Sequence, residues 1–260
     1  MPVIDAGGCP IHAEVEGHAS GPVLMLSNSL GTTLRMWDPQ MGPFAEHYRV
    51  VRFDARGHGK SGVPKGPYSM ERLGRDALAI VDGLGLEKVN WLGLSMGGMV
   101  GQWLGANAPE RIDRLILSNT SSHYADKKPW NDRINSVRVG GITAIADRVI
   151  NVWFTKAFQE RQPDTVAQMK QMMLATPVDG YLASCEAVRD MDLRDGLPKI
   201  TAPTLVIAGE HDPATNIGAG EFIRSHIPGA SMIVLDAAHI SNIEQPQAYA
   251  QEVLAFLERK

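Results

Sequence analysis

The sequence predicts an α/β fold: a mostly parallel, eight-stranded sheet with helices on both faces and an inserted helical cap. Three observations lead to this prediction. Short apolar runs alternate along the chain with stretches of helical periodicity. The alternation stops between residues 121 and 197, where helix formers, tryptophans and methionines dominate. Before that interruption, one apolar run leads through a glycine-rich turn directly into a helical stretch.

The apolar runs are predicted strands. Continuous apolar runs suit strands buried on both faces, and their alternation with helices is typical of a parallel sheet covered on both sides. The first two strands, around residues 3–4 and 13–15, are expected to form an antiparallel hairpin at the edge. Six further strands are predicted at residues 23–26, 50–53, 89–92, 115–117, 205–207 and 232–235.

Helical periodicity marks the covering layers. One helix is predicted from Met96 to Ala106, directly after a strand. Apolar residues recur every three or four positions in two other segments, which indicates helices with one buried face. These residues are Leu73, Ala77, Ile80, Val81 and Leu84 in the first, and Tyr249, Val253, Phe256 and Leu257 in the last helix.

The interruption is interpreted as a helical cap over residues 121–197, inserted into a core formed by residues 1–120 and 198–260. Because it lies between two strands, it would cover the carboxyl ends of the sheet, where ligands bind in open α/β folds. Each single tryptophan or methionine of the cap is explained most simply by helix packing. Residues 121–123 and 192–198 are the natural hinges.

Composition excludes several classes of protein. The 260 residues are 44% hydrophobic and 21% charged, with a net charge of −4, which offers no electrostatic footprint for nucleic acid or an anionic membrane. Cys9 and Cys185 are far apart, so neither a disulfide framework nor a zinc site is indicated. No signal-like N-terminus or long apolar segment is present, which predicts a cytoplasmic location. The oligomeric state stays open, a homo-oligomer included.

Ser95 is the candidate nucleophile. It stands in the turn Gly93-Leu94-Ser95-Met96-Gly97, between a predicted strand and a predicted helix. Such an elbow strains the backbone at the serine and exposes its hydroxyl, while the flanking glycines allow close approach of neighbouring backbone. The G-x-S-x-G pattern arises easily by chance, so the prediction depends on this strand-to-helix context and on partners further along the chain.

A serine nucleophile needs a general base, which a carboxylate must orient. In elbow-type folds the chain order is serine, then acid, then histidine. His239 follows the last predicted strand and is assigned as the base; Asp212 follows the preceding strand and is assigned as the acid. The competing residues are Glu210 for the acid, and His211 and His123 for the base.

The developing oxyanion also needs donors. The backbone N–H of Met96, at a helix N-terminus, would point at the oxyanion and gain from the helix dipole. A second N–H is expected from the loop after the 23–26 strand, and its position favours Leu30, although that loop could also be only a tight turn.

The order of motifs resembles the α/β-hydrolase superfamily across essentially the whole chain. Within it, the loops resemble those of 3-oxoadipate enol-lactonases, which open an enol-lactone in the β-ketoadipate route of aromatic catabolism. One departure is Asn28-Ser29, where many superfamily members carry His-Gly. The resemblance rests on residues 27–32, 37–38, 54–61, 93–98, 119–121 and 238–242, together with Trp130 and Arg133.

This resemblance implies a triad that works without metal or organic cofactor, on a small anionic lactone. Trp130 would pack on the lactone ring, and Arg133, three residues further on the same predicted helix, would bind the carboxylate. The alternative for Arg133 is a solvated charge on the cap. Hydrolysis would proceed through an acyl-enzyme on Ser95.

Other functions remain open at this point. A general carboxylesterase or a C–C ring-fission-product hydrolase would use the same triad, since loops can change the substrate without changing the elbow. A third hypothesis is a non-catalytic ligand-binding protein. The presence of all three candidate triad residues, Ser95, Asp212 and His239, argues against it. A haloalkane dehalogenase would carry an aspartate in place of Ser95.

Overall fold

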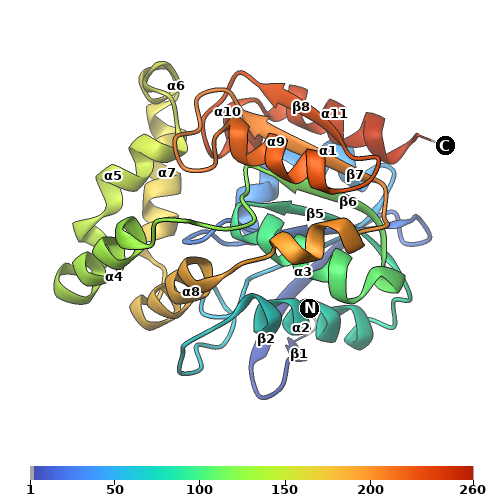
Figure 1. The fold of residues 1–260 in the computed structure, drawn as a ribbon, viewed down its shortest axis with the longest axis horizontal. Helices are drawn as coiled ribbons and strands as arrows, with labels where there is room; N and C mark the ends of the chain where they lie inside the picture. Colours follow the sequence, from blue (N-terminus) through green and yellow to red (C-terminus); the bar gives the residue numbers. More distant parts are fainter. Residues whose placement is uncertain (1–2, 260) are drawn as a thin grey trace.

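The computed structural model describes residues 3–259, and a sheet of eight strands forms its centre (Figure 1). The strand order is β1-β2-β4-β3-β5-β6-β7-β8. From β4 to β8 all neighbours are parallel, whereas β2 pairs antiparallel with both β1 and β4, which confirms the predicted edge hairpin. The strands are β1 (Val3–Asp5), β2 (Pro10–Gly17), β3 (Val23–Ser27), β4 (Arg49–Phe53), β5 (Val89–Leu94), β6 (Ile112–Ser118), β7 (Thr204–Gly209) and β8 (Ser231–Leu235).

Burial of the strands follows their place in the sheet. Every residue of β5 and of β7 is buried, as expected for central strands covered on both faces. The expectation of a strand buried on both faces is wrong for β8, where only Leu235 is buried and Val234 is 45% exposed. The reason is that β8 ends the sheet, so it has a partner strand on one side only.

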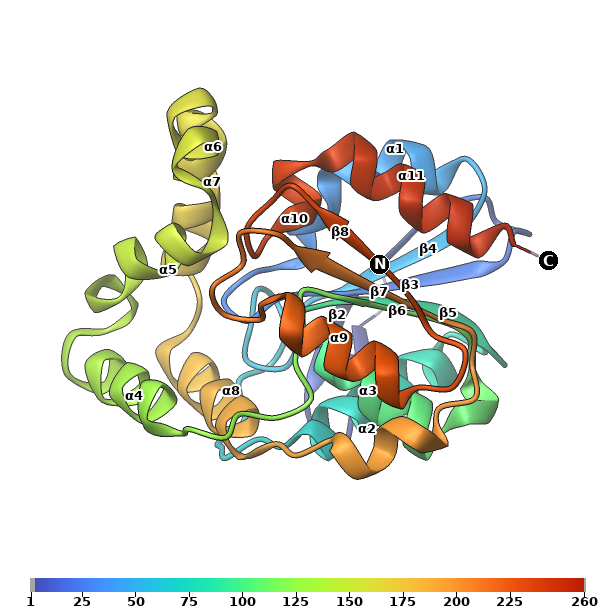
Figure 2. The same ribbon diagram turned by 45° about the horizontal axis from the view of Figure 1, so that its top comes forward.

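Helices cover both faces of the sheet (Figure 2). The helix predicted from Met96 is α3, and the segment predicted from Leu73 is α2, with Leu73, Ala77, Ile80 and Val81 all buried. One face carries α2 (Met70–Gly83), α3 (Met96–Asn107) and α9 (Ile217–His226), and the other carries α1 (Asp38–Ala45) and α11 (Pro246–Leu257), with the short α10 (Ser241–Glu244) before α11.

A group of helices between β6 and β7 lies over the carboxyl ends of the parallel strands, as Figure 1 shows. The inserted helical cap is thus present, while the exact boundaries 121 and 197 remain a prediction. Trp153, Phe154, Met169 and Met173 are buried among its helices, as packing predicts. The cap helices are α4 (Lys128–Gly140), α5 (Ala146–Trp153), α6 (Lys156–Arg161), α7 (Pro163–Leu174) and α8 (Val178–Asp190).

Short 3-10 helices complete the chain at Leu34–Trp37, Pro109–Arg111, Ile142–Ala144 and Arg194–Lys199. None of the helices within residues 3–259 combines the length and the apolar character that crossing a membrane requires.

Candidate active site

Ser95 lies between the end of β5 and the start of α3, in a strained turn. Its φ of 56° and ψ of −114° are rare for a residue with a side chain. The turn is tight enough to need glycine on both sides. A Cβ on Gly93 would lie 2.1 Å from the carbonyl oxygen of Gly97, and one on Gly97 would lie 2.2 Å from that of Ser27. The sequence pattern therefore has a steric cause.

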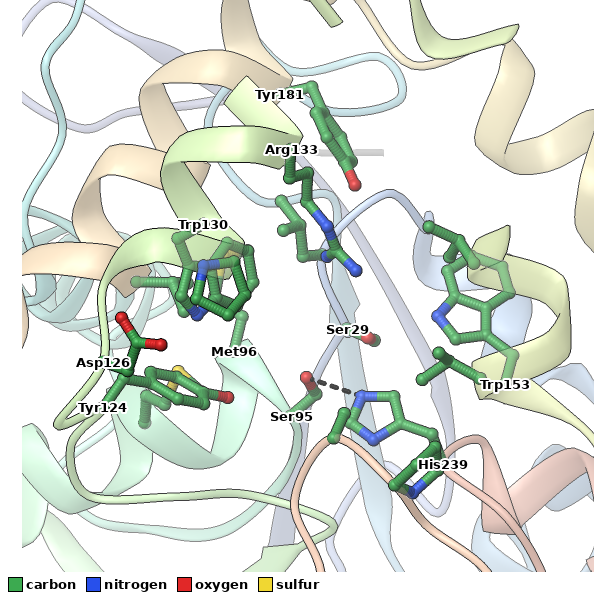
Figure 3. Close-up of a pocket in the computed structure, with 18 residues that line it drawn as sticks. Ser29, Ser95, Met96, Tyr124, Asp126, Trp130, Arg133, Trp153, Tyr181 and His239 are labelled. Atoms are coloured by element: carbon green, nitrogen blue, oxygen red, sulfur yellow. Dashed lines mark hydrogen bonds between the residues drawn. The ribbon is translucent and has the colours of Figure 1, made fainter. Parts of the chain in front are cut away.

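The structure brings Ser95, His239 and Asp212 together, and Figure 3 shows His239 facing Ser95. Asp212 follows β7 and His239 follows β8, so both lie at the sheet edge that carries Ser95. Nε2 of His239 lies 2.9 Å from Oγ of Ser95, and Nδ1 lies 2.8 Å from Oδ2 of Asp212. Because an ionised carboxylate only accepts, Nδ1 carries the proton and Nε2 is free to accept from the serine hydroxyl. All three side chains are buried.

Asp212 is stabilised as a carboxylate. Burial opposes its charge, but His239 and the hydroxyl and amide of Thr215 outweigh that effect and hold its pKa well below the usual range. Thr215 Oγ1 donates to Oδ2 at 2.6 Å, and the amides of Ala214 and Thr215 donate to Oδ1 at 2.8 and 3.0 Å. The acid therefore stays ionised throughout the neutral range and can hold the imidazole in one tautomer.

The competing residues lie elsewhere. Glu210 and His211 are exposed, and His211 Nε2 pairs with Asp236 at 2.9 Å. His123 packs against the ring of Phe222, with centroids 5.8 Å apart. The side chains of Glu210, His211 and Asp236 bring ligand atoms within 4.8 Å of one another, a proximity that their spacing in the sequence did not indicate. The hydrogen bond between His211 and Asp236 explains why those two side chains lie close together.

The two residues expected to donate to the oxyanion, Leu30 and Met96, line the same cavity as Ser95. The amide of Met96 is the first of α3, so no carbonyl of its own helix accepts from it. In the described part of the chain the amide of Leu30 has no hydrogen-bond acceptor either. The two segments are joined directly, because Gly97 N donates to the carbonyl of Asn28 at 3.1 Å. Leu30, Met96 and Ser95 all line one cavity.

That cavity has a volume of about 280 Å³ and lies between the core and the cap (Figure 3). Its volume is at the low end for ligand sites, which suits a small substrate. Trp130, Trp153, Tyr124 and Tyr181 supply aromatic walls. Burial raises the pKa of both tyrosine hydroxyls well above the usual range, so they remain protonated.

Arg133 is a cation that reaches this cavity from α4, where Figure 3 shows it among the lining residues. Its guanidinium carbon lies 4.7 Å from the centre of the Trp130 ring, on the same helix. Among residues 3–259 no carboxylate lies within ion-pair distance of Arg133. The sequence-predicted pair Trp130 and Arg133 is therefore close together, with the charge of Arg133 available to a ligand.

Sequence reasoning missed two residues that hold the acid. The first is Thr215, described above; the second is Asn119 at the end of β6. Nδ2 of Asn119 donates to Asp212 at 3.1 Å and to the carbonyl of Ala238 at 3.2 Å, and its φ is 43°. A positive φ is tolerated best by asparagine among residues with side chains. An asparagine two residues after the strand predicted at 115–117 was the available signal, although its partners are distant in sequence.

Comparison with known proteins gives the class first. A family model described as the alpha/beta hydrolase fold matches residues 22–246. Together with the sheet order and the strained serine, this match defines a hydrolase with the α/β-hydrolase fold.

Individual relatives identify the family within this superfamily. The 3-oxoadipate enol-lactonase 2 of Acinetobacter baylyi is 41% identical over 243 residues, which cover 94% of this chain and 91% of the relative. The enol-lactonase of Burkholderia xenovorans superposes with a TM-score of 0.96 at 40% identity, covering 99% of both chains. A hydrolase from Pseudomonas aeruginosa gives 0.95 at 44% identity, covering 98% of this chain and 97% of its own. The chain belongs to the 3-oxoadipate enol-lactonase family.

Proposed function

We propose that this hydrolase converts 3-oxoadipate enol-lactone to 3-oxoadipate, in the catabolism of aromatic compounds, with Ser95 as nucleophile, His239 as base and Asp212 as orienting acid. The observation that carries the proposal is the convergence of a serine nucleophile and a free cation on one small cavity. The substrate is a cyclic ester that bears a carboxylate, so it needs both groups. The names of the two enol-lactonase relatives agree with it.

The first chemical step forms a bond between Ser95 Oγ and the lactone carbonyl carbon. Nε2 of His239, 2.9 Å from Oγ, takes the hydroxyl proton as the bond forms. The carbonyl oxygen becomes an oxyanion and accepts hydrogen bonds from the amides of Leu30 and Met96. Asp212 stabilises the imidazolium that results.

Collapse of the oxyanion breaks the bond between the carbonyl carbon and the ring oxygen. The leaving group is an enolate, which delocalises its charge better than an alkoxide and takes the proton from His239. The resulting enol tautomerises to a ketone, and the opened chain stays attached to Ser95 as an acyl-enzyme. A water molecule, deprotonated by His239, then hydrolyses the ester and releases 3-oxoadipate.

Arg133 would select for the acetate group of the substrate. A guanidinium binds a carboxylate in a planar, two-pronged geometry, and the stacking on Trp130 limits its movement. A general carboxylesterase for neutral esters has no use for a free cation in its cavity. A ring-fission-product hydrolase acts on longer substrates, which a cavity of about 280 Å³ suits less well.

The test measures the loss of enol-lactone absorbance beside hydrolysis of a neutral activated ester. Ser95→Ala should reduce kcat on both substrates by about a thousandfold or more. Arg133→Ala should raise KM for the lactone about 10- to 100-fold, because a charged hydrogen bond is worth roughly 1.5–3 kcal/mol, and leave the neutral ester nearly unchanged. The matched control is Arg138→Ala, on the same helix but paired with Glu186 at 3.1 Å.

Each outcome separates one alternative. Fast ester hydrolysis with negligible lactone turnover would retain the triad and assign the protein to the general esterases. Equal KM values for the lactone in Arg133→Ala and Arg138→Ala would show that Arg133 does not bind the substrate. Lack of turnover on every activated ester would support the non-catalytic, ligand-binding alternative.

A further inference from the structure

The segment Asp54 to Ser61 has no part in the chemistry above, although it is one of the stretches that carry the family resemblance. It is a turn directly after β4, and it lies against residues 28–34, here called the oxyanion loop. Three hydrogen bonds join the turn and strand end to this loop. Asn28 Nδ2 donates to the carbonyl of Phe53 at 2.8 Å, Gly31 N donates to Nε2 of His58 at 3.0 Å, and Leu34 N donates to Oδ1 of Asp54 at 2.9 Å. The turn thus supports the beginning, middle and end of the loop.

The middle contact requires a neutral histidine. The side chain of His58 has no exposed surface, and its Nδ1 lies 3.1 Å from the carbonyl oxygen of Arg56. A carbonyl can only accept, so Nδ1 carries the proton. The amide of Gly31 can only donate, so Nε2 must be unprotonated. Both ring nitrogens are therefore satisfied in one tautomer only, and a second proton on the ring would remove the acceptor of Gly31.

The surroundings of His58 favour this neutral state. Burial lowers its pKa from the ordinary value, against the opposing effects of the Arg56 carbonyl and of the charge on Asp54. Asp54 is the charged group that faces the ring from its own turn. From other elements, Gly31 of the oxyanion loop donates to the ring, and Gly180 of α8 packs on the neighbouring Gly57.

The hydrogen bond of Gly31 fixes the backbone next to the expected donor Leu30. The carbonyl oxygen of Ser29 accepts from Thr32 N at 3.2 Å and from Thr32 Oγ1 at 2.8 Å. Since N–H and C=O point in opposite directions across a trans peptide, this contact aims the Leu30 N–H away from Thr32. The peptide on the other side of Leu30 is held by His58. Both peptide planes around Leu30 are therefore fixed.

We propose that His58 is a positioning residue for the oxyanion hole: its neutral imidazole holds the peptide after Leu30, so that the Leu30 amide stays aimed at the substrate carbonyl. The proposal rests on the role given to Leu30 in the proposed function. His58 does not touch the substrate. It acts through the backbone, and its protonation removes the support.

The experiment compares His58→Leu, which lacks the acceptor, with His58→Gln, which can accept from Gly31 and does not titrate. Three quantities are measured in each: kcat on a neutral activated ester, affinity for a trifluoromethyl ketone that forms an oxyanionic adduct with Ser95, and affinity for 3-oxoadipate. His12→Asn is the matched control, a buried histidine that pairs with Glu14. Far-UV circular dichroism establishes that each variant is folded.

In His58→Leu, kcat and the affinity for the ketone should both fall about 10- to 100-fold, which is no more than the decrease in kcat caused by removing one oxyanion donor. The affinity for 3-oxoadipate should stay near that of the wild type. His58→Gln should recover most of the loss, and His12→Asn should resemble wild type. Unchanged kcat and ketone affinity in a folded His58→Leu would overturn the proposal, as would a parallel loss of 3-oxoadipate affinity. If His58→Leu does not fold, His58→Gln decides: a loss of ketone affinity as large as that of Ser95→Ala would contradict the proposal.

Acid stability gives an independent measurement. Below the ordinary histidine pKa of about 6.5, an unfolded chain protonates this residue while the native ring stays neutral, so acidification favours unfolding until the lower native pKa is reached. Between pH 7.5 and 5.5, wild type should therefore lose more unfolding free energy than His58→Gln. Equal losses would overturn the neutral-acceptor role. An inactive wild type, or an active Ser95→Ala, would contradict the proposed function instead.

Discussion

The carboxylate of Asp212 accepts hydrogen bonds from His239, Thr215 and Asn119, which come from three different loops. Asn119 also donates to the carbonyl of Ala238, directly before His239. One amide group thereby ties the loop of the acid to the loop of the base. The alignment of the proposed triad therefore depends on side chains that do no chemistry themselves.

Replacement of the acid gives a sharp prediction. In Asp212→Asn, the new amide can donate to Nδ1 of His239, which favours the tautomer with a proton on Nε2. That tautomer cannot accept the Ser95 proton, so kcat should fall about 10⁴-fold while the fold is retained. The kcat on an activated ester and far-UV circular dichroism measure the two effects. The control is Glu210→Gln, which should keep wild-type kcat; loss of activity there instead would make Glu210 the acid.

Connections between elements hold the base as well. The backbone after β8 forms two hydrogen bonds with the end of α5. His239 N donates to the carbonyl of Val152 at 3.4 Å, and Ile240 N donates to the carbonyl of Trp153 at 3.0 Å. Glu244 of α10 is buried and lies between the same two regions. It accepts from Ala238 N at 2.9 Å and from the hydroxyl and amide of Thr155, the N-cap of α6.

Removal of the Glu244 carboxylate should loosen this junction. Glu244→Ala leaves the amide of Ala238 and the hydroxyl of Thr155 without their acceptor, which should lower the free energy of unfolding by roughly 1–3 kcal/mol. Hydrogen exchange should become faster at residues 152–155 and 238–240. Urea unfolding and exchange mass spectrometry measure both effects, with the exposed Glu160→Ala on α6 as control. Identical exchange in the two variants would contradict a role for Glu244 at the junction.

The cap also contacts the core through α8, on the side of the site opposite the α5 to α6 junction. The start of α8 touches the turn after β4, where a Cβ on Gly57 would lie 2.6 Å from the Cα of Gly180. Further along α8, Tyr68 N donates to the carbonyl of Ala183 at 3.4 Å. The cap is therefore attached to the core through α8 and through the α5 to α6 junction, and we expect it to unfold together with the core.

The two free cysteines can test this cooperativity. Cys9 lies in the core and Cys185 on α8, both buried, and burial raises the pKa of each thiol, that of Cys185 to about 12. Both should be unreactive in the native protein and should become labelled over the same urea transition. Labelling with a chromogenic disulfide reagent, followed by peptide mass spectrometry, distinguishes them. Modification of Cys185 at a lower urea concentration than Cys9 would show that the cap opens separately.

The fold was predictable from the sequence because local patterns specify it. Apolar runs mark strands such as β5 and β7, helical periodicity marks α2, and the close contact between Gly93 and the Gly97 carbonyl explains the glycines of the elbow. Chain order was enough to predict that His239 and Asp212 lie close to Ser95, since both follow strands whose ends meet Ser95 at one edge of a parallel sheet.

Contacts between distant segments were not predictable in the same way. Asn119 and Asp212 are 93 residues apart, and Thr155 and Glu244 are 89 residues apart, so no periodicity or spacing connects them. The exposure of Val234 depends on β8 being the last strand, and the neutral state of His58 depends on burial beneath the oxyanion loop. Local sequence specifies which elements form and in what order, because strand and helix patterns act over a few residues. Burial, tautomer and hydrogen-bond partners are set by packing across the whole chain.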